Sequence, residues 1–184
     1  LVGPPQGPDQ AELLRAFDLP IALMQDVEAL ERITMDLVEA KAASALNHPH
    51  VCIVYDVGES DEGLPFIAME FVEGETIASL LDRGVRFKPE RVISLVSQIA
   101  SAVDYAHGKG VIHRDIKPSN LILYEGERVK VTDFGIAKLI DTEMTQSGTL
   151  LGTPSYMSPE QAMGEKLDGR SDIFSLGVCA FEML

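Results

Sequence analysis

Several residue types are scarce in this 184-residue chain, and each scarcity excludes a class of protein. Tryptophan is absent, and 15 basic residues face 29 acidic ones, which gives a net charge of −14 at pH 7. Such an acidic surface argues against nucleic acid as a partner, because binding to a phosphate backbone needs basic side chains. No apolar run approaches the roughly 18 residues that a membrane-spanning helix needs. We therefore expect a soluble globular chain without a membrane segment of its own.

Cysteine is also scarce, and the chain ends carry few signals. Cys52 and Cys179 lie far apart in apolar stretches, so we expect buried free thiols rather than a disulfide or a metal site. The start, LVGPPQGPDQ, lacks the basic and apolar regions of a signal peptide, and it has no initiator Met. The end, GVCAFEML, stops inside an apolar helical pattern. We expect a fragment of a longer parent that acts in the cytoplasm, whether or not that parent is anchored in a membrane.

Hydrophobic periodicity predicts strands in the first part of the chain and helices in the second. We expect an irregular segment over 1–18, a short strand over 19–25, an amphipathic helix over 26–46, and strands over 51–58 and 65–72. Further on we expect helices over 76–84 and 89–110, a hairpin around Glu125-Gly126, and a last helix capped by Ser171 or Asp172. This order predicts an α+β fold with two lobes, a partial first lobe over 19–73 and a partial helical lobe over 74–184.

The stretch HRDIKPSN, residues 113–120, concentrates polar chemistry between two apolar runs. Asp115, Lys117 and Asn120 fall within six residues, and the predicted hairpin returns Asp133, in the triplet DFG, close to Asn120. The Asp133 carboxylate and the Asn120 amide oxygen are hard ligands that suit Mg²⁺. Asp115 is placed to accept a proton from a hydroxyl group, and Lys117 to neutralise charge on a phosphoryl group. This set matches phosphoryl transfer, in which catalysis is mostly positioning and charge stabilisation.

Four motifs, HRDIKPSN, DFG, GTPSYMSPE and SDIFSLGV, stand in the order and spacing of the protein kinase superfamily. From about residue 19 onward the chain resembles bacterial serine/threonine protein kinases of the eukaryotic-like type. The resemblance implies transfer of the γ-phosphate of Mg·ATP to Ser or Thr hydroxyls of protein substrates. It makes Asp115 the catalytic base, makes Asn120 and Asp133 the Mg²⁺ ligands, and places Lys117 at the γ-phosphate. Thr153 and Lys117 match the pattern of serine/threonine kinases rather than that of tyrosine kinases.

The resemblance also implies an ATP site and a regulatory segment. Met69 is similar to the gatekeeper residue. The segment from Glu70 through Val72 is similar to the hinge that binds adenine, and Ile122 is similar to the apolar residue beneath the adenine ring. Glu75 is placed to reach the ribose, and Glu39 matches the helix glutamate that pairs with a strand lysine. His113 and Phe134 match the apolar spine between the lobes. Without the resemblance, each of these residues has a simpler interpretation. Residues 69–75 fit a buried strand followed by a turn, Ile122 fits core packing, and Glu39 fits a solvated charge on a helix.

Residues 133–160 resemble an activation segment. Thr145 and Ser147 match phosphorylated positions, and Arg114 and Lys138 are the cations that would bind such a phosphate and order the segment. Without phosphorylation the same residues make an ordinary polar loop. Glu160 matches the glutamate that pairs with an arginine from later helices of the family. Because those helices do not follow in this chain, we expect Leu176, Val178 and Phe181 to be exposed.

The first 25 residues depart from the family pattern. They hold no G-x-G-x-x-G loop, and the strand lysine falls on Met24, whose thioether cannot hold phosphates or pair with Glu39. Lys41 lies on a different face of the predicted helix from Glu39 and does not replace that lysine. Three interpretations stay open: an active kinase domain in its parent, a pseudokinase-like binding or scaffold module, and an inactive truncated fragment.

Overall fold

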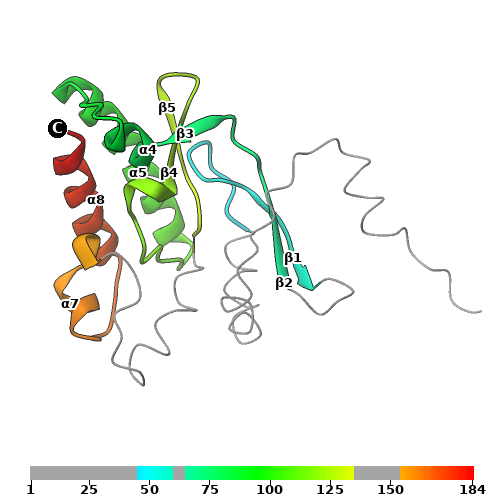
Figure 1. Cartoon of the computed structure of the whole chain (residues 1–184). Helices are drawn as coiled ribbons and strands as arrows, with labels where there is room; N and C mark the ends of the chain where they lie inside the picture. The colour runs from blue at the N-terminus through cyan, green and yellow to red at the C-terminus, as the bar shows by residue number, and fades with distance from the viewer. Residues whose placement is uncertain (1–44, 60–64, 135–153) are drawn as a thin grey trace, which may run out of the picture.

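The computed structural model describes residues 45–59, 65–134 and 154–184 (Figure 1). The strand predicted over 19–25 and nearly all of the helix predicted over 26–46 lie outside these residues. The described elements are β1 (Val54–Glu59), β2 (Pro65–Met69), β3 (Gly74–Thr76), α4 (Ile77–Asp82), α5 (Pro89–Gly108), the 3₁₀ turn η2 (Pro118–Asn120), β4 (Leu121–Tyr124), β5 (Arg128–Val131), the 3₁₀ turn η3 (Pro154–Tyr156), α7 (Pro159–Ala162) and α8 (Arg170–Met183). The protein has an α+β fold, as the sequence predicts.

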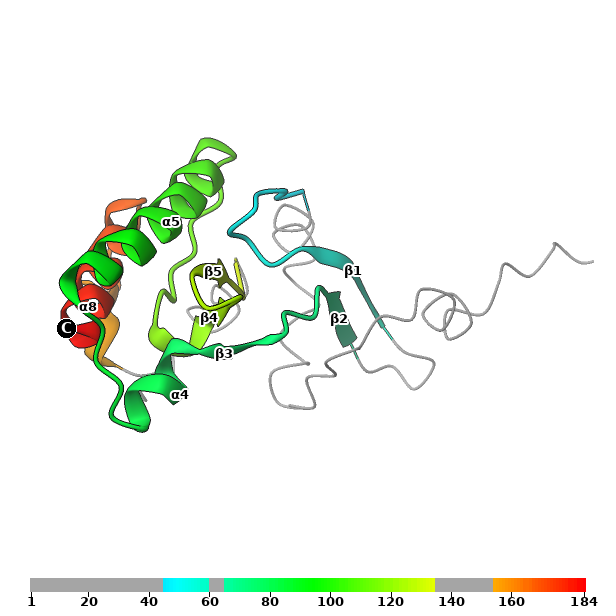
Figure 2. The ribbon, with the colours of Figure 1, turned by 90° about the horizontal axis from the view of Figure 1, so that it is seen from above.

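The strands form two small antiparallel sheets on one side of the helices (Figures 1 and 2). β1 pairs with β2, so that Val54 lies opposite Met69, and the predicted strand over 51–58 is regular only from Val54 onward. Before it, Val51 bridges to Val131 of β5. Residues 51–53 therefore connect the first sheet to the second. The lobe boundary predicted at 73/74 stays a prediction.

The second sheet has the order β3-β4-β5. The predicted hairpin is confirmed: β4 and β5 pair from Leu121↔Val131 to Tyr124↔Arg128 around a three-residue turn. Glu125 and Gly126 occupy the left-handed region at φ 48° and 70°, which the tight turn requires. β3 was missed by the sequence analysis, because three residues with a glycine first carry no alternating pattern. Its last residue, Thr76, accepts a hydrogen bond from the Ser79 N–H and caps α4, as predicted.

Helix α5 is the centre of the described core, and its predicted bounds are confirmed within two residues. Pro89 starts it, and one face is buried along its length: Val92, Leu95, Ile99, Ala102, Val103 and Ala106. The helix ends in a Schellman motif, in which the N–H of Val111 donates to the Ala106 carbonyl and that of Gly110 to His107. Gly110, at φ 79°, takes the left-handed position that favours glycine. This ending turns the chain directly into residues 111–120.

Helix α8 packs beside α5 (Figure 2). Two predictions about it are wrong. It begins at Arg170, so Ser171 and Asp172 lie in its first turn and neither is the cap. Leu176 is buried rather than exposed, because its side of the helix, with Cys179 and Met183, joins the core cluster around α5.

On the opposite side of α8, Phe181 is 83% exposed, as expected. Val178 was also expected to be exposed but is partly buried. Both cysteines are buried free thiols, as predicted. None of the helices among the described residues is long and apolar enough to cross a bilayer.

Candidate active site

The segment 111–120 leaves α5 and is fixed to the core by apolar side chains and by His113. Val111 and Ile116 are buried, and His113 is fully buried. The His113 ring lies 4.6 Å from the Phe134 ring, centroid to centroid, and its Nε2 is 2.8 Å from the Thr132 carbonyl oxygen. The two residues that the resemblance assigns to an apolar spine are therefore in contact. This contact ties the polar loop to the DFG triplet at the end of the hairpin.

Asp172, in the first turn of α8, organises the loop through hydrogen bonds to its backbone. Its buried carboxylate accepts from the N–H groups of His113, at 2.9 Å, and Arg114, at 2.7 Å. The same carboxylate lies 2.7 Å from Nε2 of His107, near the end of α5. From the sequence, Asp172 was expected only to cap the helix. An acidic residue before an apolar helical run fits a cap so well that no signal in the sequence pointed to this second role.

The backbone at Arg114 takes a left-handed conformation, at φ 70°. This is costly for a side chain with a Cβ, by roughly 1–2 kcal/mol. The hydrogen bond from Arg114 N–H to Asp172 offsets part of that cost. At the next residue, the N–H of Asp115 donates to Nδ1 of His113, at 3.2 Å. The predicted base therefore follows a backbone turn that is held by specific partners.

The structure brings Asp115, Lys117 and Asn120 together, as expected. The Nζ of Lys117 lies 2.6 Å from Oδ2 of Asp115. Asn120 Nδ2 donates to the same oxygen, at 3.1 Å, and to the Asp115 carbonyl, at 2.9 Å. Asn120 is buried, whereas Asp115 and Lys117 are partly exposed. An ammonium group and a carboxylate thus stand at the surface of the loop, partly exposed to solvent.

Asn120 and Asp133 lie at the same end of the β4–β5 hairpin. The N–H of Thr132 donates to the Asn120 carbonyl at 3.0 Å, which brings the residue before Asp133 against Asn120. Burial raises the pKa of the Asp133 carboxyl, although the Thr132 hydroxyl donates a hydrogen bond to it at 3.3 Å. Nδ2 of Asn120 is held by Asp115, and its amide oxygen accepts only a long hydrogen bond from the Ser119 hydroxyl, at 3.3 Å, so this oxygen can still bind a cation. These oxygens fit Mg²⁺, which is usually bound by one or two protein ligands together with phosphates.

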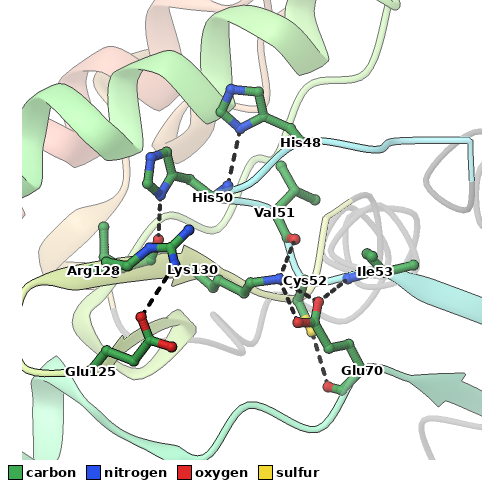
Figure 3. A network of polar contacts seen from close by, with 10 residues as sticks. His48, His50, Val51, Cys52, Ile53, Glu70, Glu125, Arg128 and Lys130 are labelled. Atoms are coloured by element: carbon green, nitrogen blue, oxygen red, sulfur yellow. Dashed lines mark hydrogen bonds and ion pairs between the residues drawn. The ribbon is translucent and has the colours of Figure 1, made fainter.

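The segment after β2, which the resemblance makes the hinge, is held by an ion pair between buried Lys130 and partly buried Glu70 (Figure 3). Lys130 Nζ lies 2.5 Å from each carboxylate oxygen of Glu70. One of these oxygens also accepts a hydrogen bond from the N–H of Ile53, at 3.1 Å. The Glu70 N–H donates to the Ile53 carbonyl, and the Cys52 thiol donates to the Glu70 carbonyl at 3.3 Å. Glu70 therefore connects residues 51–53, the predicted hinge and β5.

The other predicted nucleotide contacts lie on the neighbouring strands. Met69 ends β2, where its sulfur lies 3.9 Å from the Thr132 hydroxyl. No hydrogen bond joins the Val72 N–H to another residue in the described part of the chain, so this donor is open to a ligand. Ile122 is partly buried in β4. Glu75 binds the Ser79 hydroxyl at 2.7 Å and Arg83 at 2.8 Å, a surface arrangement that a ribose would have to share.

Several predicted residues fall outside the described part of the chain: Met24, Glu39, Lys41, Lys138, Thr145, Ser147 and Thr153. Their roles stay predictions, as does the regulatory role of Arg114. Glu160 is described, and the hydroxyl of Ser171 donates to its carboxylate at 2.6 Å. This hydrogen bond lowers the pKa of Glu160. This partner from α8 was not predicted from the sequence.

Comparison with known proteins identifies the family. The family described as "Protein kinase domain" matches residues 24–184. The chain is 47% identical over 155 residues to serine/threonine-protein kinase pkn3 of Myxococcus xanthus, covering 79% of this chain and 28% of that protein. It is 44% identical over 152 residues to the probable serine/threonine-protein kinase SCO3848 of Streptomyces coelicolor, with 79% and 23% covered. It is 42% identical over 151 residues to serine/threonine-protein kinase PknB of Mycobacterium leprae, with 79% and 24% covered.

The chain therefore belongs to the protein kinase domain family, and the resemblance drawn from its motifs is confirmed. It spans about a quarter of the length of these relatives. Kinases of this family generally use ATP and Mg²⁺.

Proposed function

We propose that the chain is the catalytic portion of a serine/threonine protein kinase, which transfers the γ-phosphate of Mg·ATP to Ser or Thr hydroxyls of proteins. The observation that carries the proposal is the arrangement of Lys117 and Asn120 around one carboxylate oxygen of Asp115, at 2.6 and 3.1 Å. Family membership supports the same activity. The kinase domain would act in the cytoplasm, where ATP is available.

In this proposal Asp115 accepts the proton of the substrate hydroxyl as the hydroxyl attacks phosphorus. Asn120 holds Asp115 through two hydrogen bonds, and this fixes the orientation of the base. The ammonium group of Lys117 then balances the charge of the transferring phosphoryl group. Mg²⁺, when bound at Asp133 and Asn120, would supply further neutralisation of the phosphate oxygens.

Adenine would bind along residues 69–72. The Val72 N–H is a free donor among the described residues. The Glu70 carbonyl is the acceptor, and its thiol partner is a weak donor that an exocyclic amine can displace. Ile122 would contribute the apolar floor and Glu75 the ribose contact. Glu39 and Thr153 complete the proposed site, and phosphorylation of Thr145 or Ser147 would recruit Arg114 and Lys138.

The test is the intact mass of the purified chain after incubation with Mg·ATP, beside an Asp115→Asn variant. We expect whole phosphate additions of about 80 Da in the wild-type chain only, mapping to Thr145 or Ser147. Asparagine at this position preserves the size and hydrogen bonds of the side chain but removes the base. Equal phosphorylation of both proteins would contradict the role of Asp115. A folded wild-type chain that gains no mass would contradict the proposed activity.

A further inference from the structure

Gln161, in the third position of α7, makes two side-chain hydrogen bonds in opposite directions. Its Oε1 accepts from the N–H of Ser158, at 3.0 Å, and its Nε2 donates to the Arg114 carbonyl, at 2.6 Å. The N–H of Gln161 also donates to the Ser158 hydroxyl, which completes a capping box. One bond therefore serves the helix itself. The other reaches a residue 47 positions earlier in the chain, in the catalytic loop.

The chemistry of the two partners fixes the orientation of this amide. A backbone N–H only donates and a backbone carbonyl only accepts. The oxygen of Gln161 must therefore face Ser158, and the nitrogen must face Arg114. If the amide were turned over, both hydrogen bonds would be lost at once.

Helix capping alone does not explain an amide at this position. The third residue of a capping box is Glu or Gln, because either can accept the N–H of the capping residue. A carboxylate, however, has no hydrogen to give to the Arg114 carbonyl. The second hydrogen bond is thus the one that needs Gln rather than Glu.

The contact acts on the peptide group that joins Arg114 to Asp115. Its carbonyl accepts from Gln161, and its N–H donates to Nδ1 of His113. The preceding peptide group is held as well, through the Arg114 N–H and Asp172. Between these supports Arg114 stays in the left-handed conformation, at φ 70°. The Gln161 bond therefore supports the carbonyl side of the peptide group immediately before Asp115, and His113 supports its N–H side.

We propose that Gln161 is a positioning residue: its amide orients the Arg114–Asp115 peptide and thereby couples α7 to the orientation of Asp115. The catalytic consequence rests on the proposed function, in which Asp115 is the base, whereas the structural consequence does not. A displacement of α7 would be transmitted to the base through one hydrogen bond.

Gln161→Glu separates the two roles, because Glu keeps the capping bond and removes the donor. The chain offers a matched control in Gln98 of α5. The Gln98 side chain also accepts from a backbone N–H, that of Val129, and donates to a backbone carbonyl, that of Glu127. Gln98→Glu makes the same chemical change at the hairpin turn, on residues that take no part in the proposed site.

Two readouts test the proposal in the full chain. The first is amide hydrogen exchange of the peptide covering residues 113–118, which requires no catalysis. We expect Gln161→Glu to speed this exchange about fivefold, because a net hydrogen bond shifts an opening equilibrium by roughly that factor, and Gln98→Glu to leave it unchanged. The second is phosphorylation of casein with Mg·ATP. We expect kcat to fall at least about tenfold in Gln161→Glu, with KM for ATP within about twofold, because a misplaced base costs rate rather than nucleotide binding.

Gln161→Met, which removes both bonds without adding a charge, guards against an effect of the new carboxylate. It should lower kcat as much as Gln161→Glu does, and it should lower the stability more, because the cap is lost as well. Unchanged exchange over 113–118 in Gln161→Glu would overturn the proposal. So would equal losses of kcat in the variants of Gln161 and Gln98. If the wild-type chain transfers no phosphate, the proposed function fails, and the exchange measurement still decides the role of Gln161.

Discussion

The buried ion pair between Lys130 and Glu70 gives the sharpest prediction about stability. The Lys130 side chain is only 10% exposed and that of Glu70 is 23% exposed. Lys130→Met removes the cation and leaves the carboxylate with the Ile53 N–H as its remaining partner among the described residues. Removing one member of a buried pair costs about 3–5 kcal/mol. Because Glu70 retains some access to water, we expect the lower end of this range, about 3 kcal/mol.

Glu70→Gln should cost less, about 1.5 kcal/mol, because the amide oxygen still accepts from Lys130 or from Ile53. The double variant should be little worse than Glu70→Gln, since the introduced thioether then faces a neutral amide rather than an unpaired carboxylate. A double-mutant cycle by urea denaturation should therefore give a coupling energy of about 2–3 kcal/mol. Additivity within about 0.5 kcal/mol would refute the argument that the two charges stabilise each other.

The exposed pair between Arg170 and Asp168 provides the control. The side chains are 88% and 55% exposed, and their closest ion-pair distance is 2.9 Å. Arg170→Met should lower the stability only slightly, because solvent screens surface pairs. Added salt should erase that small loss and leave the coupling of the buried pair nearly unchanged. A salt-sensitive coupling at Lys130 would place that pair in solvent and contradict its burial.

Three further predictions concern the described core. Asp172→Ala should lower the free energy of unfolding by about 3 kcal/mol in urea titrations, because three partners lose a buried acceptor; a change below about 1 kcal/mol would contradict its organising role. Burial raises the pKa of Cys52 to about 11 and that of Cys179 to about 12, so iodoacetamide at about pH 8 should label neither thiol until urea unfolds the chain. The Ser171 hydroxyl lowers the pKa of Glu160. The hydrogen bond between them therefore stabilises the chain above the ordinary carboxyl pKa, and this stabilisation is lost as the pH falls through the lowered pKa of Glu160. Ser171→Ala should therefore be less acid-sensitive than the wild type in thermal melts from about pH 6 to 3.

The elements that the sequence predicted well are those whose signals are local. Pro89 and the glycines after residue 107 mark both ends of α5, and the Glu125-Gly126 pair marks the hairpin. The spacing within HRDIKPSN placed Asp115 and Asn120 together because so few residues cannot separate them far. In each case the information lies within a few residues of the feature. Tertiary contacts did not have to be known.

The residues that the sequence analysis missed already had a sufficient local explanation. Lys130 alternates with buried valines in β5, which is typical of a solvent-facing strand position, yet residues 51–53 and Glu70 cover it. Asp172 fits the start of a helix, and Gln161 fits a capping box. Each of these side chains reaches a partner between 47 and 60 residues away in sequence. No periodicity or spacing rule specifies such a partner before the fold is known.

These contacts also separate two requirements of the proposed reaction. The supports of Asp115 come from Asp172, Gln161 and His113, all within residues 113–172. The departure from the family pattern that the motifs predict, at Met24, lies in the first 25 residues. In the family, the strand lysine and the glycine loop hold the phosphates of ATP and do not orient the base. The supports of Asp115 therefore do not depend on those phosphate contacts, and saturation with Mg·ATP is the condition under which the loop's own contribution to the rate becomes measurable.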